Sequence, residues 1–238
     1  MNNLIKNTHP QWQPLLLKAL SSMDQNYLSQ LKQEKGWLPG YPNIFAAFSQ
    51  PLDATKYILL GESPYPRSES ANGYAFWDES VKSIWSETGL SKAVNRATSL
   101  RNIMKMLLIA RGDLQSDLSQ DAIAKLDKNT YCQTAEEFFR SMMEKGFLLL
   151  NATLVYSEGE VKFHARHWKP FMTSLFLQLK ELPQSIEFIL FGRIAADVPE
   201  ARQFDCLVAE HPYNISFITN PDVLDFFKPL DLLSCHND

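Results

Sequence analysis

Hydrophobic and polar positions follow two different periods along this chain. Apolar residues recur about three and four positions apart over 10–20 and 23–35, which predicts two amphipathic helices near the start. The same period predicts helices over 99–114 and 167–182. In the first of these, the apolar side chains of Leu100, Ile103, Met104, Leu107 and Leu108 form one stripe.

Short continuous apolar runs, bounded by turn-forming residues, separate these helical stretches. Such runs are typical of strands that are buried on both faces. Four of them predict strands that end at Gly61, Asn151, Gly192 and His211. A short helical turn is expected at 43–48, with Asn43 as its cap.

The alternation of strands and helices predicts an α/β fold. We expect a three-layer α/β/α sandwich around a central four-stranded parallel sheet. No stretch rich in proline, glycine and serine divides the chain, so residues 1–238 are interpreted as a single domain. Because open α/β sheets bind ligands at the carboxyl ends of their strands, the residues after each strand are candidate site residues.

The composition is that of a globular protein with a substantial core. Hydrophobic residues make up 45% of the chain and charged residues 21%. The longest apolar runs are too short to cross a bilayer, and the first residues lack the pattern of a signal peptide. Three scattered cysteines without CxxC spacing indicate a reducing compartment and argue against structural zinc. We therefore expect a cytoplasmic protein that does not associate with membranes.

The net charge of −4 counts against a dedicated nucleic-acid binder. A local basic patch is nevertheless possible in the segment KFHARHWK, where Lys162, His164, Arg166, His167 and Lys169 gather. The alternative is an ordinary solvated surface. A metal site on the two histidines is disfavoured, since no acidic or cysteine ligand lies near them in the sequence. No motif for a nucleotide cofactor occurs, so we expect no cofactor.

Four motifs at the strand ends carry a family resemblance. They read GESPYP at 61–66, GYAF at 73–76, LLLN at 148–151 and HPYNIS at 211–216. In this order they resemble GQDPYH, GLAF, LLLN and HPSPLS of the uracil-DNA glycosylase superfamily, in its classical uracil-excising branch, and the spacing from the first motif to the second also matches. The resemblance extends over nearly the whole chain.

The resemblance implies base excision repair of DNA. A uracil would be flipped out of the stack, and its N-glycosidic bond would be hydrolysed. Phe76 matches the aromatic residue that stacks on the flipped base, and Asn151 matches the amide that reads its Watson–Crick edge. Tyr65 matches the residue whose bulk excludes the 5-methyl group of thymine. These three residues form the expected base pocket.

The resemblance also implies contacts with the leaving base and the DNA backbone. His211 matches the histidine that stabilises negative charge on O2 of uracil. Ile215 matches the apolar wedge that enters the vacated stack, and Ser99 and Ser216 match phosphate contacts. The implied partner is uracil-containing DNA, single- or double-stranded, bound by a monomer.

One departure bears directly on catalysis. Ser63 stands where the family has an aspartate that orients the attacking water, and Pro66 replaces the closing histidine. Loss of a positioned base typically lowers a rate by about 10²- to 10⁴-fold. Glu62, one position earlier, is a candidate replacement, although adjacent residues of an extended strand point in opposite directions.

Three hypotheses follow. The chain is a working glycosylase, a catalytically weak or inactive homologue that binds DNA, or a protein-binding scaffold that has lost DNA. Each site residue also has an ordinary structural interpretation. Asn151 could cap a turn, Phe76 and Ile215 could be core residues, and Glu62 and His211 could be solvated.

Overall fold

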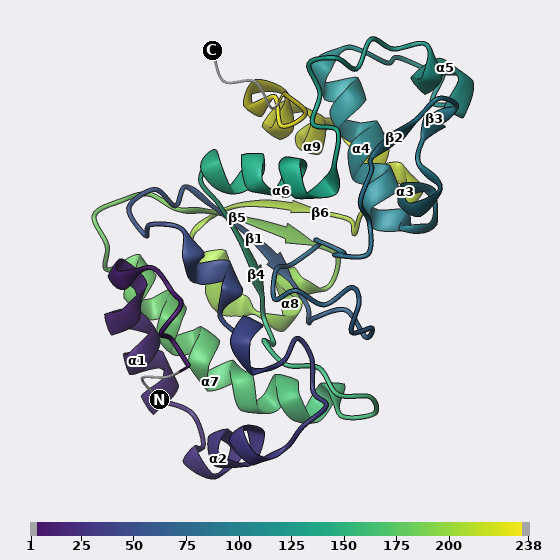
Figure 1. Cartoon of the computed structure of the whole chain (residues 1–238). Coiled ribbons are helices and arrows are strands. Elements are labelled where there is room, and N and C mark those ends of the chain that lie inside the picture. Colours follow the sequence, from purple (N-terminus) through teal and green to yellow (C-terminus); the bar gives the residue numbers. More distant parts are fainter. Residues whose placement is uncertain (1–3, 235–238) are drawn as a thin grey trace. The chain divides into compact units, whose positions relative to one another are not determined.

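The computed structural model describes residues 4–234 (Figure 1). The chain divides into two compact units. Unit 1 comprises the described residues of Met1–Asp78, Gly146–Leu190 and Ile194–Cys206. Unit 2 comprises those of Glu79–Lys145, Phe191–Arg193 and Leu207–Asp238. Whether the chain behaves as the single domain expected from its sequence stays a prediction.

The main sheet has four strands in the order β4-β1-β5-β6. Their bounds are β1 Tyr57–Gly61, β4 Phe147–Asn151, β5 Glu187–Phe191 and β6 Asp205–Ala209. β1 pairs in parallel with β4, from Tyr57 opposite Phe147 to Gly61 opposite Asn151, and in parallel with β5 on its other side. The prediction of an α/β fold around a four-stranded parallel sheet is confirmed.

Unit 1 contains most of the helices that flank these strands in the sequence. They are η1 Pro10–Trp12, α1 Gln13–Ser21, α2 Gln25–Gln33, η2 Tyr41–Asn43, η3 Ala46–Ser49, α7 Val161–Lys180, α8 Ile194–Asp197 and η4 Pro199–Gln203. The N-terminal α1 and the long α7 lie side by side (Figure 1). Both present a buried apolar stripe, as their 3.6-residue period predicts.

The core of unit 1 lies between these helices and one face of the strands. Alternate strand residues belong to it together with buried residues of η1, α1 and α7, among them Ile58, Leu60, Leu148, Leu150, Phe188, Leu190, Trp12, Leu16, Trp168 and Phe171. The intervening residues Leu59, Leu149 and Ile189 are equally buried. Burial on both faces explains why these strands read as continuous apolar runs.

Unit 2 is built around α4 Thr98–Arg111. Its other elements are β2 Trp85–Ser86, β3 Gly89–Leu90, α3 Lys92–Arg96, α5 Gln120–Ala124, α6 Ala135–Glu144, η5 Ile215–Thr219, α9 Pro221–Phe227 and η6 Lys228–Leu230. Helix α4 ends at Gly112, which takes the left-handed conformation, and it packs against α3, η5 and α9.

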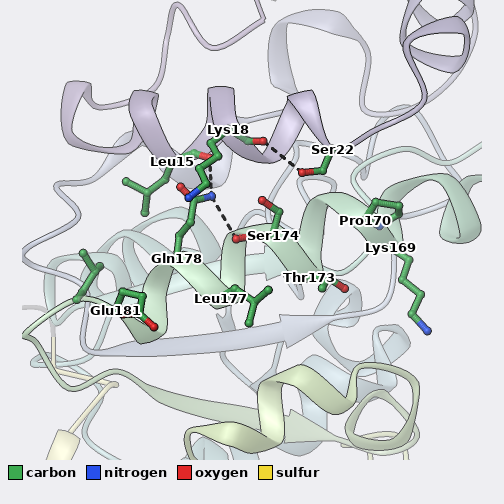
Figure 2. Close-up of a pocket in the computed structure, with 11 residues that line it drawn as sticks. Leu15, Lys18, Ser22, Lys169, Pro170, Thr173, Ser174, Leu177, Gln178 and Glu181 are labelled. Carbon is green, nitrogen blue, oxygen red and sulfur yellow. Dashed lines mark hydrogen bonds between the residues drawn. The ribbon is translucent and has the colours of Figure 1, made fainter.

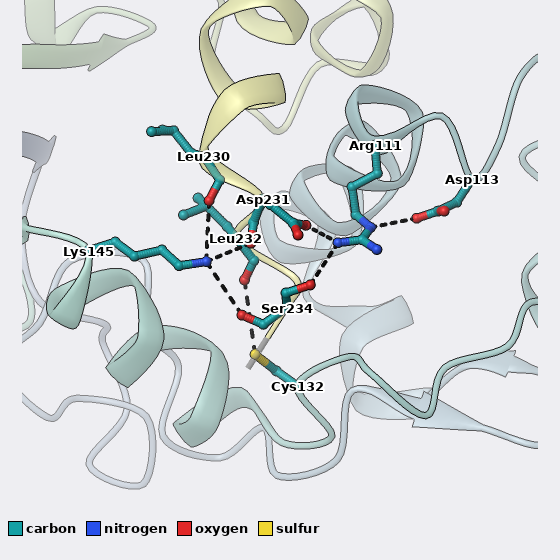
Figure 3. A network of polar contacts seen from close by, with 8 residues as sticks. All are labelled: Arg111, Asp113, Cys132, Lys145, Leu230, Asp231, Leu232 and Ser234. Atoms are coloured by element: carbon teal, nitrogen blue, oxygen red, sulfur yellow. Dashed lines mark hydrogen bonds and ion pairs between the residues drawn. The ribbon is translucent and has the colours of Figure 1, made fainter. Parts of the chain in front are cut away.

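The last described residues of unit 2 are held by two basic side chains (Figure 3). Lys145 Nζ donates hydrogen bonds to the backbone oxygens of Leu230 and Asp231, at 3.2 and 2.6 Å. Arg111 forms ion pairs with Asp113 and Asp231 and donates to Ser234 Oγ at 3.0 Å. The segment after α9 is thus tied to the ends of α4 and α6.

Several element boundaries differ from the sequence-based predictions. Helix α7 begins at Val161, six residues before the predicted start, and includes Pro170 in its interior. Asn43 ends η2 instead of capping a following turn, and the last strand stops at Ala209. Helices α3, α5, α6 and α9 were not predicted, although α6 carries a complete capping box between Thr134 and Glu137.

Candidate functional site

The amide of Asn151 occupies a defined place at the ends of β1 and β4. Asn151 is buried and lies directly opposite Gly61 in the strand register. Its Oδ1 lies 2.6 Å from the point where a Cβ on Gly61 would stand, and the Cβ of Ala75 lies 2.9 Å from that point. Any side chain at position 61 would therefore displace the amide.

The two strands remain hydrogen-bonded to each other beyond their ends. The backbone N–H of Ala152 donates to Gly61 O at 2.8 Å, and that of Thr153 donates to Glu62 O at 3.0 Å. This pairing holds the first residues of the GESPYP loop against the segment after Asn151. The chain on both sides of the amide is thereby fixed.

The loop that carries Phe76 docks on the same strand. The backbone N–H of Ala75 donates to Leu149 O at 3.0 Å, which places Phe76 next to the end of β4. Phe76 has a φ of +63°, a left-handed conformation that is rare for a bulky residue and costs energy. Its side chain is half-buried. The surrounding structure therefore holds the Phe76 backbone in this conformation.

Tyr65 lies against the backbone of this loop. Its hydroxyl donates to Phe76 O at 3.3 Å. Burial, with a smaller contribution from the negative charge of Asp78, raises the pKa of Tyr65 above its ordinary value. Asp78 in turn pairs with Arg67 at 3.0 Å. Within unit 1, Asn151 and Ala75 thus adjoin Gly61, and Tyr65 bonds to the backbone of Phe76, the residue after Ala75.

Glu62 and Ser63 have different surroundings. Glu62 is exposed and lines a cavity of about 370 Å³ together with residues of α7 and α8, including Arg166, Lys169 and Asp197. None of Ser63, Tyr65, Phe76 or Asn151 lines this cavity. Ser63 is half-buried, and its hydroxyl makes no hydrogen bond with any described residue. Glu62 thus lines a cavity that the other motif residues do not line, although Ala152 and Thr153, which follow Asn151, also line it.

His211 belongs to unit 2 and lies against a second strand-end glycine. Gly192, at a φ of +68°, follows β5, and a Cβ built on it would stand 2.9 Å from the Cβ of His211. The ring atom Nδ1 of His211 accepts a hydrogen bond from the backbone N–H of Tyr213 at 3.1 Å. When the His211 ring is neutral and Nδ1 accepts this hydrogen bond, the ring proton is on Nε2.

The other predicted DNA-contacting residues also lie in unit 2. Ile215 is 81% exposed, so the interpretation of this residue as a core residue is wrong. Ser216 is exposed, and its side chain hydrogen-bonds to Glu210. The pKa of Glu210 falls below its ordinary value because the bonds from Ser216 and Asn220 outweigh its desolvation. Ser99 is half-buried in the first turn of α4.

The basic patch predicted in KFHARHWK is only partly formed. His164 is buried, with Nδ1 2.7 Å from the Tyr27 hydroxyl and Nε2 3.1 Å from Ser157 Oγ. His167 stacks on the Tyr27 ring. The inclusion of His164 in a surface patch is therefore wrong, because the helix extends through this segment and turns the ring into the core. Lys162, Arg166 and Lys169 are exposed.

A further surface hollow lies between α1 and α7 (Figure 2). It has a volume of about 900 Å³ and is bridged by Gln178, whose Nε2 donates to Leu15 O at 3.1 Å. Lys169 of the predicted basic patch lines it, but none of the residues matched to the family motifs does. Within residues 4–234, no helix is both long and apolar enough to span a membrane.

Comparisons with known proteins agree with this arrangement of fold and motifs. No protein-family model matches the sequence. A curated uracil-DNA glycosylase of Limosilactobacillus fermentum is 30% identical over 203 residues, covering 83% of this chain and 74% of the relative. This chain belongs to the uracil-DNA glycosylase family. A second member, from Corynebacterium glutamicum, is 26% identical over 87% of this chain and 81% of its own length.

Solved structures place the chain within this family in more detail. The crystal structure of wild-type UNG from Nitratifractor salsuginis has a TM-score of 0.93 and 40% sequence identity, covering 98% of this chain and 96% of that one. The uracil-DNA glycosylase of mimivirus has a TM-score of 0.58 at 19% identity, which shows a shared fold alone.

Two residues that support the site were not found by sequence analysis. One is Gly192, which leaves room for His211, and its only signal was its position at a strand end. The other is Asn102, a buried amide of α4 whose Nδ2 donates to Pro212 O at 2.7 Å. Position 102 lies off the apolar stripe of α4 predicted from the sequence, so no local pattern signalled that Asn102 is buried.

Proposed function

We propose that this protein is a DNA glycosylase of base excision repair, which binds a flipped uracil and hydrolyses its N-glycosidic bond. The family membership supports the reaction class. The observation that carries the proposal is the placement of the Asn151 amide beside Gly61, next to the loop that holds Phe76. An amide and an aromatic ring held in this way suit the edge and the face of a pyrimidine.

In this proposal the unit 1 residues recognise the base. The Asn151 amide offers one donor and one acceptor, which matches O4 and N3–H of uracil. Phe76 provides the apolar surface for stacking, and its strained backbone is retained for that purpose. Tyr65, which is held by its bond to the Phe76 backbone, excludes a 5-methyl group.

His211 stabilises the departing base. Its Nδ1 is occupied by the Tyr213 N–H, so the neutral ring presents Nε2–H as a donor. We propose that this donor meets O2 of uracil, where negative charge develops as the glycosidic bond breaks. The roles of His211, Asn151 and Phe76 on the same nucleotide are part of the proposal.

Activation of the attacking water is the step for which the site lacks the expected catalytic group. Ser63 carries no charge at neutral pH, and Glu62 faces a different set of residues, on α7 and α8. We therefore propose that Ser63 only orients the water and that excision proceeds slowly, without a carboxylate general base. The loss of such a base lowers rates by about 10²- to 10⁴-fold.

We further propose that the protein acts as a cytoplasmic monomer on single- or double-stranded DNA, without a metal or nucleotide cofactor. Ile215 enters the vacated stack, and Ser99 contacts a backbone phosphate. Ser216 is a weaker phosphate contact than its motif implies, because its hydroxyl already bonds to the Glu210 carboxylate.

The decisive experiment uses uracil-containing oligonucleotides, single- and double-stranded. After incubation with the protein, alkali cleaves the strand at abasic sites. Scission that disappears in Asn151→Ala supports the enzyme. Absence of scission in the wild type, with retained salt-sensitive binding, would instead support a non-catalytic DNA-binding homologue. The uncharged Ser63 is the observation that favours this second function. Absence of both cleavage and binding would support the third hypothesis, a protein-binding scaffold that no longer binds DNA.

A further inference from the structure

Two large apolar side chains are exposed in the loop segment that follows β6 and includes the first residue of η5. Ile215 is 81% exposed and Tyr213 is 69% exposed. The other exposed large apolar residues of the described chain, Leu177 and Val208, are less so, at 52% and 43%. The two most exposed ones therefore stand only two positions apart in one short loop.

The backbone of this loop is firmly held. Asn102 Nδ2 donates to Pro212 O at 2.7 Å and lies 3.5 Å from the backbone oxygens of both Tyr213 and Asn214. The N–H groups of Tyr213 and Asn214 bond to Nδ1 and the backbone oxygen of His211, at 3.1 and 2.8 Å. One buried side chain thus ties three consecutive carbonyls to helix α4.

The residues that follow anchor the loop on its other side. Phe217 and Ile218 are buried, and the Phe217 ring packs edge-on against Phe191 with ring centroids 5.0 Å apart. Asn220 caps α9 and bonds to Glu210 at 2.7 Å. Tyr213 and Ile215 are therefore presented to solvent by a preorganised frame, which lowers the entropic cost of placing them in a binding partner.

We propose that Tyr213 is a further DNA-contacting residue, whose ring stacks on a nucleobase next to the flipped nucleotide while Ile215 fills the vacated space. This inference rests on the proposed function. In the family motif quoted above, the position of Tyr213 is a serine, which offers no stacking surface. An aromatic ring on a base is sequence-tolerant and strengthens binding by about five- to a hundredfold.

The test compares Tyr213→Ser and Tyr213→Phe with the wild type. Duplexes carry uracil or a stable abasic-site analogue, with the fluorescent base 2-aminopurine beside the lesion or opposite it. We expect Tyr213→Ser to weaken binding about tenfold and to abolish the fluorescence change, while Tyr213→Phe retains both. Leu177→Ser removes another exposed apolar side chain, from α7, and serves as the matched control.

The outcomes separate this inference from the function on which it rests. Suppose that the wild type excises uracil, and that Tyr213→Ser has the same affinity and the same fluorescence change as the wild type. The stacking role of Tyr213 is then overturned, and the proposed glycosylase activity is retained. If the wild type neither cleaves nor binds DNA, both proposals fail. An effect on single strands as well as duplexes places the ring on a neighbouring base of the uracil strand. An effect confined to duplexes, with a fluorescence change only for 2-aminopurine opposite the lesion, would overturn stacking on a neighbouring base.

Discussion

The side-chain oxygen of Asn151 lies where a side chain on Gly61 would begin, 2.6 Å from the ideal Cβ position. The two residues are partners in the parallel register of β1 and β4. The Asn151 amide can take this orientation because Gly61, its partner on the neighbouring strand, has no side chain. This relationship explains why glycine opens the GESPYP loop.

Gly61→Ala should impair uracil recognition through Asn151. The added methyl group meets both the amide and Ala75, so the amide must move. We expect a loss of about 1–3 kcal/mol in binding, the effect of unpairing a buried polar group. The measurement is a double-mutant cycle on kcat/KM with Asn151→Ala. Fully additive effects would show that position 61 does not act through the amide.

Ser63→Asp should increase uracil excision by about 10²- to 10⁴-fold, because it supplies an anion and a base. The hydroxyl of Ser63 bonds to no other described residue, so its replacement breaks no hydrogen bond among them. Single-turnover cleavage of a uracil oligonucleotide provides the rate. Glu62→Gln is the matched control and should leave the rate unchanged, since Glu62 faces the α7 cavity. A large loss in Glu62→Gln would contradict the proposed mechanism.

Asn102 should act as a positioning residue for the loop that contains His211 and Ile215. In Asn102→Ala the carbonyls of Pro212, Tyr213 and Asn214 lose their shared donor. We expect faster hydrogen exchange at the Tyr213 amide, a lower kcat and a stability loss of about 1–3 kcal/mol. Asn102→Asp, which keeps the size but removes the donors, should behave no better. Unchanged exchange in both variants would refute this role.

The stability of unit 1 should depend on pH through His164. Burial lowers the pKa of His164, an effect that outweighs the nearby charge of Glu160. The unfolded chain therefore binds the proton first as the pH falls through about 6.5. Stability is complete above that pH and declines below it. Chemical denaturation at several pH values should show a shallower decline in His164→Gln.

Lys145→Met should loosen the end of unit 2. Nζ of Lys145 donates to the carbonyls of Leu230 and Asp231, and both carbonyls lose this charged donor in the variant. The expected cost is about 1–3 kcal/mol in the free energy of unfolding. Lys82→Met removes an exposed pair with Glu79 and should cost less than about 1 kcal/mol. Equal effects of the two substitutions would mean that the Lys145 contacts contribute little.

The strands and their ends could be predicted from local patterns. A strand buried on both faces must be a continuous apolar run, and the runs that end at Gly61 and Asn151 are strands with those ends. Asn151, Phe76 and Tyr65 could be predicted as neighbours only through the family motifs, because no local rule brings positions 65, 76 and 151 together. The contacts around Gly61 supply that link.

Other features depended on partners distant in the chain. The start of α7 was predicted too late, because the bonds of His164 to Tyr27 and Ser157 hold that turn in place. The cavity that Glu62 lines is formed with residues of α7 and α8, which lie more than 90 positions further along the chain. The period and composition of the sequence were thus enough to predict the strands, because the backbone hydrogen bonds of a strand repeat regularly along it. The orientation of single polar side chains did not follow from them, because it depends on contacts between residues far apart in the sequence.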